Sequence, residues 1–374
     1  MATISMDRLL QACITQGASD IHIVTGRPPT FRIDGQLRAL ETKVLEPDDT
    51  MALMKSITTE RNRQELEEQG GSDFGFAFGD AARFRVSVFK QKGNISIVMR
   101  LIPTKMMTFE EIGLPKICAT LCRRPNGIFL VTGPTGCGKT STLATMVNYI
   151  NENLNRHIIT IEQPIEYYHK HKKCIINQRT VGIDVPSFSE ALKRSIRQDP
   201  DVIVVAELKD QETIAAALSA AETGNLVFST LPTTSASGTI SRIVDVFPSG
   251  QQPQVRSQLA NSLMAVLSQV LCPLATGKGR IAAFEFMVVT SAISNLIREN
   301  KTYRIDSSIQ TGKKLGMQLL DDHLWQLYEG GRITVEQLLE KSRQPNIVRE
   351  KLMGMSGGKK ALEGIENIDD MGEF

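Results

Sequence analysis

A strand-to-helix connection rich in glycine, GIFLVTGPTGCGKTSTLATMVN at residues 127–148, constrains this chain more than any other segment. Its apolar start, residues 128–131, has the length and β-branched content of a buried strand. The residues that follow read G-x-x-x-x-G-K-T, and a helix is expected from Lys139 onward. Glycines let backbone N–H groups converge on an anion, and the helix N-terminus adds its positive dipole end. The segment therefore predicts a site for a nucleoside triphosphate.

The pattern also assigns roles within this loop. Lys139 is expected to reach the β- and γ-phosphates, and the Thr140 hydroxyl is expected to hold Mg²⁺. The residues expected to bind the nucleotide are Gly133, Pro134, Thr135, Gly136, Cys137, Gly138, Lys139, Thr140 and Ser141.

Composition and net charge exclude few classes of protein. The 374 residues allow two or three domains, and 41% hydrophobic with 22% charged residues is ordinary for a globular protein. The net charge is +2 without a basic tract, and no apolar run approaches the roughly 20 residues of a membrane span. No signal peptide is expected. Six scattered cysteines favour a reducing compartment. Cys118 and Cys122 lack the further Cys or His pair that a zinc site needs.

Residues 1–102 are expected to form a separate α+β domain. A helix is predicted over 6–16, a hairpin around Thr30–Ile33 and a polar helix over 47–68. Alternating apolar and polar residues over 74–78, 83–89 and 95–100 predict strands of a small antiparallel sheet. Arg83, Arg85 and Arg100 would project from this sheet. They form either a solvated face or a set of contacts to a phosphate bound by another domain or subunit.

Residues 103–115, which contain two prolines and a glycine, are the expected linker. Strands and helices alternate over residues 116–353, which predicts a mostly parallel α/β sheet. The expected strands there include 157–161, 201–205, 226–231 and 281–288. The expected helices include 211–223 and a long one over 254–271, with further helices over 291–342 broken at glycines. The tail, residues 354–374, is expected to be disordered.

Acidic residues follow two of the predicted parallel strands. Glu162 and Glu166 stand at the carboxyl end of the strand at 157–161, where α/β proteins place their ligands. Glu207 follows the apolar strand at 201–205, as in a Walker B segment. We therefore expect Glu207 to be the general base or the residue that positions the attacking water.

Extended strings of this sequence resemble the secretion superfamily ATPases, in particular type IV pilus retraction motors of the PilT/PilU kind. They include ASDIH at 18–22, ARFRVSVFKQKGNISIVMRLIP at 82–103, IEQPIEYYH at 161–169, QRTVGIDVPSF at 178–188, IRQDPDVIVVAEL at 196–208, ALSAAETGNLVFSTL at 217–231, SAISNLIRENK at 291–301 and QTGKKLGMQ at 310–318. The resemblance extends over residues 5 to about 350.

The resemblance implies a ring of six subunits that binds ATP and Mg²⁺ and hydrolyses ATP. Each subunit would have a PAS-like N-terminal domain and a RecA-like C-terminal domain. The family's arginines that complete the site fall on Arg83 and Arg100, with Arg85 as a further candidate. Its acids fall on Glu162, Glu166 and Glu207. The catalytic set is thus Glu207, Glu162, Lys139, Arg83 and Arg100, and the metal ligands are Thr140, Glu162 and Glu166.

The resemblance also implies partners and a location. The motor would bind the inner-membrane platform protein of the pilus, and a second pilus retraction ATPase is a further partner. The chain is expected in the cytoplasm, peripheral at the inner membrane. A DNA translocase is disfavoured because the sequence has no basic groove tract and few aromatic residues for base stacking.

Several positions depart from the family's pattern. Gln163 replaces an aspartate, Cys137 replaces a serine and Lys209 replaces an arginine that pairs in bidentate fashion. Ser294 also stands where the family's retraction motif has an arginine. Both histidines of the family's His box are absent, and Asn225 and Pro232 stand in their places. Two interpretations stay open: a divergent motor that powers pilus retraction, or a nucleotide-binding accessory subunit with weak or no ATPase activity.

Overall fold

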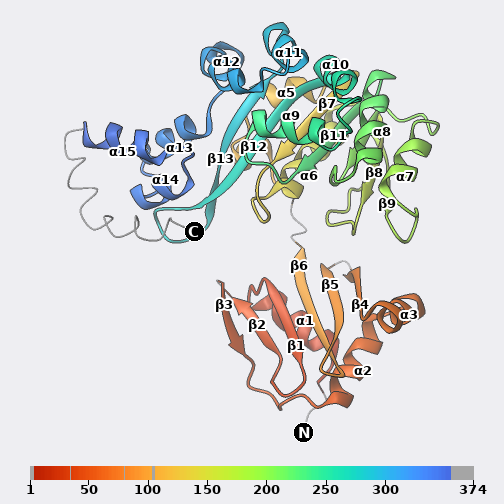
Figure 1. Ribbon diagram of the computed structural model, residues 1–374. Helices are drawn as coiled ribbons and strands as arrows, with labels where there is room; N and C mark the ends of the chain where they lie inside the picture. Colours follow the sequence, from red (N-terminus) through yellow and green to blue (C-terminus); the bar gives the residue numbers. More distant parts are fainter. Residues whose placement is uncertain (1–3, 34, 80, 103–105, 355–374) are drawn as a thin grey trace. The chain divides into compact units, whose positions relative to one another are not determined.

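The computed structural model describes residues 4–33, 35–79, 81–102 and 106–354. Residues 103–105 of the expected linker and residues 355–374 of the expected disordered tail lie outside the described residues. By its packing the chain divides into two compact units (Figure 1). The first contains the chain up to Met106 together with Glu162–Tyr168, and the second contains the rest.

Among the described residues, the first unit forms a six-stranded antiparallel sheet in the order β3-β2-β1-β6-β5-β4. Its elements are α1 (Met6–Thr15), β1 (Asp20–Val24), β2 (Thr30–Ile33), β3 (Gln36–Ala39), α2 (Pro47–Ile57), α3 (Glu60–Gln69), β4 (Gly71–Phe78), β5 (Ala82–Gln91) and β6 (Asn94–Ile102). The expected small antiparallel sheet is confirmed.

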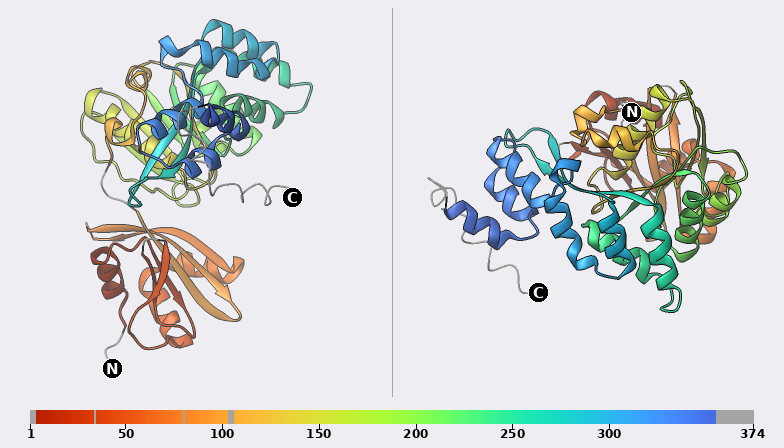
Figure 2. Two further views of the ribbon diagram at one scale, coloured as in Figure 1. Left: turned by 90° about the vertical axis from the view of Figure 1, so that its left-hand side faces the viewer. Right: turned by 90° about the horizontal axis from the view of Figure 1, so that it is seen from above.

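One face of this sheet carries the first unit's apolar core. Phe84 and Val86 of β5 pack in the same cluster as Leu10 of α1 and Met54 of α2. Alternation along the strands explains this arrangement, because successive side chains of a strand point to opposite faces. Figure 2 shows helices α1–α3 gathered along that sheet.

The polar helical segment expected over residues 47–68 is divided into two helices in the structure. Helix α2 ends at Ile57, and Thr59 starts α3 as its N-cap. The Thr59 side chain accepts a hydrogen bond from the Asn62 N–H, and the Asn62 side chain accepts one from the Thr59 N–H. Such a reciprocal capping box satisfies two donors that a helix start leaves open, so it favours a new helix at this point.

Within the described residues, the second unit contains a seven-stranded sheet in the order β13-β12-β7-β11-β10-β8-β9. Its strands are β7 (Gly127–Thr132), β8 (His157–Glu162), β9 (Ile175–Thr180), β10 (Val202–Val205), β11 (Leu226–Leu231), β12 (Leu263–Pro273) and β13 (Arg280–Val288). Strands β12, β7, β11, β10 and β8 pair in parallel, and β13 pairs with β12 in antiparallel fashion.

Helices cover both faces of this sheet. The α-helices of the second unit among the described residues are α4 (Phe109–Ile112), α5 (Ile117–Leu121), α6 (Lys139–Asn153), α7 (Phe188–Ser195), α8 (Gln211–Glu222), α9 (Ala236–Asp245), α10 (Gln252–Ser262), α11 (Ser291–Arg298), α12 (Ile305–Thr311), α13 (Leu320–Glu329), α14 (Val335–Lys341) and α15 (Pro345–Met353). Successive residues of β7 pack against opposite faces of the sheet. Ile128 packs in the core with α7–α12, and Phe129 packs in the core with α5 and α6. Every residue of β7 is buried, as expected for a strand covered on both sides.

The long helix expected over residues 254–271 is wrong in its second half. Helix α10 ends at Ser262, and the apolar run that follows forms β12. Short apolar runs do not by themselves distinguish a buried helix from a buried strand. Here β12 completes the sheet beside β7, so pairing with a neighbouring strand decides the outcome.

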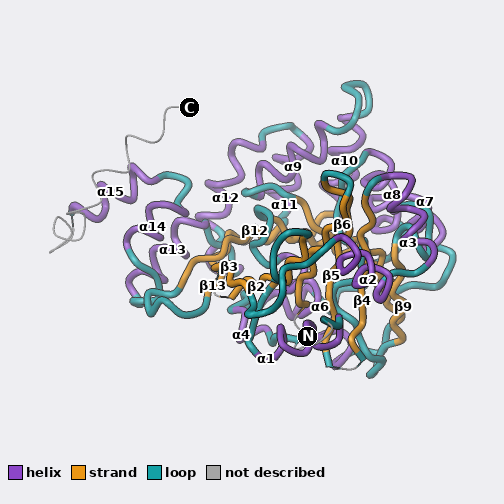
Figure 3. Tube along the Cα trace, turned by 90° about the horizontal axis from the view of Figure 1, so that it is seen from below, coloured by secondary structure: helices purple, strands orange, loops and turns teal. Residues whose placement is uncertain are grey.

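Helices α13, α14 and α15 form a small group at one end of the second unit (Figure 3). They enclose their own core, in which Trp325 and Leu338 pack with Cys272 of β12 and Ala283 of β13. The expectation of helices broken at Gly312 and at Gly330-Gly331 is confirmed. The α/β class is likewise confirmed, and no helix among the described residues is long and apolar enough to cross a membrane.

A buried carboxylate in the first unit generates a stability prediction. Asp20 is 4% exposed, and its Oδ1 accepts a hydrogen bond from Arg100 Nε at 2.8 Å. Burial raises the pKa of Asp20, but the hydrogen bonds from Ser19 and Arg100 outweigh it and hold the pKa below its usual value of 3.8. The charged form is therefore favoured in the folded state, and its contribution is present above the unfolded pKa.

We expect Asp20→Asn to lower the free energy of unfolding by about 1–3 kcal/mol at pH 7. The difference from the unmutated protein should shrink as the pH falls through the folded pKa of Asp20, where its carboxyl becomes neutral. Urea unfolding followed by circular dichroism measures both effects. Asp73→Asn, an exposed position on β4, is the matched control. Equal unfolding midpoints for the two variants at pH 7 would contradict the prediction.

Candidate active site

The connection between β7 and α6 has the form of a phosphate-binding loop. Gly133 follows β7 with φ +144°, and Gly138 precedes α6 with φ +91°. A Cβ at Gly133 would lie 2.3 Å from the Gln269 carbonyl oxygen and 2.6 Å from Cys137 Sγ. Only glycine fits there, so the close packing of the loop against β12 explains the first glycine of the motif.

Lys139 and Thr140 start helix α6 beside this loop. Lys139 Nζ donates hydrogen bonds to the carbonyl oxygens of Gly133, at 2.7 Å, and Pro134, at 3.0 Å. The ammonium group thus lies over the loop where phosphates would be held. Cys137 is buried, and burial raises the pKa of its thiol, so this residue is a neutral packing group. Thr140 is half-buried in the first turn of α6.

Gln269 of β12 joins the loop to the neighbouring strand. It is 2% exposed, its Nε2 donates to the Cys137 carbonyl at 2.6 Å, and its Oε1 accepts from Thr142 Oγ1 at 2.8 Å. One strand position earlier, Ser268 shares a hydrogen bond of 2.7 Å with Thr132. The sequence did not identify Gln269 as a site residue, because a helix was predicted over the segment that contains it. A polar Ser-Gln pair inside an apolar run of strand length could have indicated its role.

The acid that follows β10 lies on the same edge of the sheet. Val205 pairs with Ser229 of β11, and Ser229 pairs with Leu130 of β7. Glu207 lies two positions beyond Val205. Thr132, the last residue of β7, likewise lies two positions beyond Leu130. The Glu207 carboxylate lies 3.2 Å from Lys209 Nζ. The Glu207 side chain stays partly exposed on the edge that carries the phosphate-binding loop.

The two positions at which the resemblance implies histidines, 225 and 232, lie at opposite ends of β11. Asn225 precedes the strand and donates to the Pro200 carbonyl at 2.5 Å. Pro232 follows Leu231, whose carbonyl accepts a hydrogen bond from the Gly133 N–H at 3.3 Å. Of these two positions, Pro232 is therefore the one next to the phosphate-binding loop.

The segment Glu162–Tyr168, which begins at the last residue of β8, packs with the first unit. Glu166 Oε1 lies 3.6 Å from Arg85 Nη1, and the Arg83 guanidinium lies 3.5 Å from the centre of the Tyr168 ring. Two of the three candidate arginines are thus engaged with this segment. The third, Arg100, pairs with Asp20.

The donors in the phosphate-binding loop fit Mg²⁺. Mg²⁺ prefers oxygen ligands and is commonly held by one or two protein groups together with phosphate oxygens and water. The half-buried Thr140 hydroxyl next to Lys139 is such a group. No cluster of three or more His, Cys, Asp or Glu that could hold a metal occurs among the described residues. A metal here would therefore depend on the nucleotide for several of its ligands.

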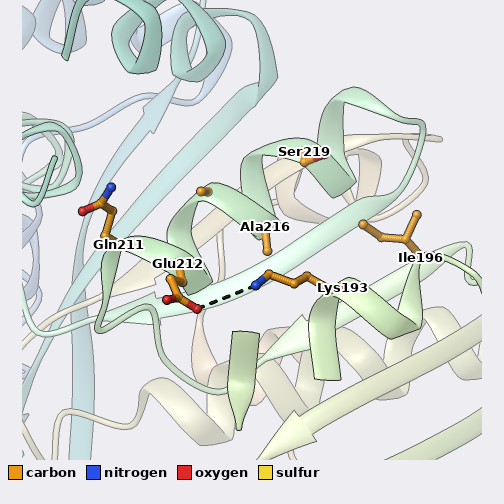
Figure 4. A pocket seen from close by; sticks show the side chains of 7 residues that line it. Lys193, Ile196, Gln211, Glu212, Ala216 and Ser219 are labelled. Atoms are coloured by element: carbon orange, nitrogen blue, oxygen red, sulfur yellow. Dashed lines mark ion pairs between the residues drawn. The ribbon is translucent and has the colours of Figure 1, made fainter. Parts of the chain in front are cut away.

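A groove of about 390 Å³ lies between α7 and α8, away from these groups. Ile196 and Ala216 line it, and Lys193 and Glu212 form an ion pair of 3.7 Å across it (Figure 4). None of its lining residues belongs to the phosphate-binding loop or to the strand ends described above. We do not assign the nucleotide to it.

Comparison with known proteins agrees with this geometry. Residues 2–277 match the family described as type II/IV secretion system protein. The type IV pilus retraction ATPase PilT of Pseudomonas aeruginosa is 48% identical over 337 residues, which cover 90% of this chain and 98% of that protein. A twitching motility protein of Neisseria gonorrhoeae is 44% identical over 308 residues, with 82% of each chain covered.

Among solved structures, the pilus retraction motor PilT with bound ADP has a TM-score of 0.86 and 45% sequence identity to this chain. The likeness covers 93% of this chain and 99% of that one. The similarity therefore includes both units and the phosphate-binding loop.

The contacts of Gln269 generate a prediction about nucleotide affinity. Gln269→Leu keeps a similar volume but removes the bonds to Cys137 and Thr142, and leaves two buried polar groups without partners at a cost of about 1–3 kcal/mol. Because the phosphate-binding loop would lose its anchor, we expect the Kd for Mg-ATP to rise about tenfold, which corresponds to about 1.4 kcal/mol. Isothermal titration calorimetry measures it.

Gln254→Leu is the matched control, since Gln254 is exposed on α10. Equal affinities of the two variants for Mg-ATP would show that the bonds of Gln269 do not shape the loop.

Proposed function

The chain belongs to the type II/IV secretion system protein family, among the type IV pilus retraction ATPases, and on this premise we propose that it is a hexameric motor. The motor hydrolyses Mg-ATP and powers pilus retraction by depolymerising pilin, which gives twitching motility. One observation carries the proposal: Lys139, Thr140 and Glu207 lie at one edge of a parallel sheet, around a loop shaped for phosphates.

In the proposed reaction, water attacks the γ-phosphate in line with the leaving oxygen. Lys139 and the amides of residues 133–138 stabilise the charge that develops on the phosphoryl oxygens. Glu207 orients the water and receives its proton. Mg²⁺, when bound with the nucleotide, neutralises phosphate charge. Thr140 would hold it, with Glu162 and Glu166 as the proposed acidic ligands.

Arginines of the first unit would complete the site of a neighbouring subunit in the ring. Arg83 and Arg100 are the proposed donors, with Arg85 as a further candidate. A planar guanidinium suits the recognition of phosphate oxygens. Motion of the two-domain unit during turnover would then transmit force. The proposed partners are the inner-membrane platform protein of the pilus and a second retraction ATPase, with the chain located in the cytoplasm at that membrane.

Pro232 favours a second candidate function. Proline has neither a side-chain donor nor a backbone N–H, so this position beside the phosphate-binding loop cannot donate a hydrogen bond to a phosphate. The chain would then be an accessory ring subunit that binds ATP and hydrolyses it weakly.

Steady-state phosphate release by the purified protein with Mg-ATP tests the proposal. Lys139→Ala and Glu207→Gln should each lower kcat by about 100-fold or more, because each removes a group that acts on the transition state. Glu329→Gln, an exposed position on α13, should keep the unmutated rate. A rate in the unmutated protein no higher than that of Lys139→Ala, with nucleotide still bound, would overturn the motor and leave the accessory subunit.

A cellular assay tests the proposed pilus role separately from the chemistry. In a piliated bacterium that lacks its own retraction ATPases, expression of this chain should restore twitching motility, and expression of the Glu207→Gln variant should not. If the chain restores motility only beside an active retraction ATPase, the accessory function is the correct one.

A further inference from the structure

We propose that Arg343 is a positioning residue: through an ion pair with buried Glu285, it ties the loop at residues 232–235 to the C-terminal helices α13–α15. These helices would then set how fast the nucleotide site turns over. The inference rests on the proposed ATPase function and adds to it a control element outside the phosphate-binding loop.

The loop at residues 232–235 starts beside the phosphate-binding loop. It follows β11, whose last residue, Leu231, pairs with Thr132 and accepts the hydrogen bond from the Gly133 N–H. The loop ends at Ser235, the N-cap of α9, whose side chain accepts a hydrogen bond from the Gly238 N–H. A shift of this loop would therefore displace Gly133 through that hydrogen bond.

Glu285 holds the far end of this loop. It lies on β13 with a fully buried side chain, and its Oε1 accepts a hydrogen bond from the Ala236 N–H at 2.7 Å. Ala236 is the first residue of α9, where helices leave N–H groups without an intrahelical partner and where negative charge is favoured. Glu285, on strand β13, thus caps the N-terminus of α9.

Arg343, between α14 and α15, compensates this buried charge. Its Nη1 pairs with Glu285 Oε2, and its Nη2 donates to the Thr234 carbonyl. The two bonds use the fork of the guanidinium, so one side chain holds both the capping carboxylate and the loop backbone.

Arg343 is itself fixed within the C-terminal helices. Its backbone N–H donates to Asp321 Oδ1 at 2.8 Å, and the Gln344 N–H donates to Asp321 Oδ2 at 3.0 Å. Asp321 lies in the first turn of α13. Through these contacts a displacement of α13 changes the place of the guanidinium, and with it the place of the loop.

Stability alone does not explain such an arrangement. A buried ion pair is commonly no more stabilising than well-packed apolar residues of similar volume. The pair does provide a fixed geometry, and Pro232 at the start of the loop has neither a side-chain donor nor a backbone N–H. Contacts to the backbone of residues 234 and 236 therefore hold the loop without a side-chain donor at position 232.

The test compares kcat and KM for ATP in four full-length proteins: unmutated, Arg343→Lys, the double variant Glu285→Met with Arg343→Met, and Arg332→Met. Lysine keeps the charge opposite Glu285 but cannot bond both partners in a planar fork. The double variant removes both charges and so leaves no unpaired buried ion. Arg332 is exposed in the same helical group and is the control.

We expect Arg343→Lys and the double variant to lower kcat about tenfold, because small displacements near a reacting centre have effects of this size or larger. KM should stay within about twofold, since neither residue is placed to contact the nucleotide. Hydrogen exchange should become faster in the peptide covering residues 232–238 in both variants. The Arg332→Met variant should match the unmutated protein in all three measurements.

An unchanged kcat in Arg343→Lys would overturn the inference, and so would a double variant that recovers both the unmutated melting temperature and the unmutated kcat. The second result would show that the pair has a purely structural role. If the double variant does not fold, the result with Arg343→Lys decides. Absence of ATP hydrolysis in the unmutated protein is a separate outcome, because it would contradict the proposed motor itself.

Discussion

The parallel pairing of β7 between β12 and β11 is the constraint on which the rest of this active site depends. Because parallel strands that pair in register end at the same edge, the loop after β7, the acid after β10 and the loop after β11 come together there. Burial on both faces keeps the register fixed, since a slip by one residue would exchange the two apolar faces. The chemistry at this edge is therefore placed by strands β7, β10 and β11, every residue of which is buried.

Neutral hydrogen bonds then fix the phosphate-binding loop within this frame. Gln269 bonds both the start of α6 and the loop carbonyl at Cys137, while Ser268 bonds Thr132. All of these groups are buried, and buried polar groups with satisfied partners rigidify a site because breaking any one bond leaves a desolvated group behind. The loop can thus present its amides without the nucleotide having to order it.

The sequence was sufficient to predict the parts of the fold that are governed by local patterns. The phosphate-binding loop, the strand before Glu207 and the α/β class were predictable because glycine spacing and apolar runs act over a few residues. The helix predicted over 254–271 was wrong because β12 is selected by its partner β7, which no local pattern records. Gln269, Glu285 and Arg343 were missed for the same reason: each acts through contacts with residues 49 or more positions away.

Proline at position 232 limits how the nucleotide site can be coupled to its surroundings. A histidine can contact a phosphate and report its presence through its own side chain, whereas proline has no donor in either its side chain or its backbone. Any dependence of this loop on the nucleotide must then pass through the backbone, first by the bond from the Gly133 N–H to the Leu231 carbonyl. A backbone link transmits displacement only if its far end is anchored, because a free loop would absorb the motion. In this chain Glu285 and Arg343 provide such anchors. Under the proposed role of Arg343, the C-terminal helices then belong to the route by which the site and its surroundings are coupled.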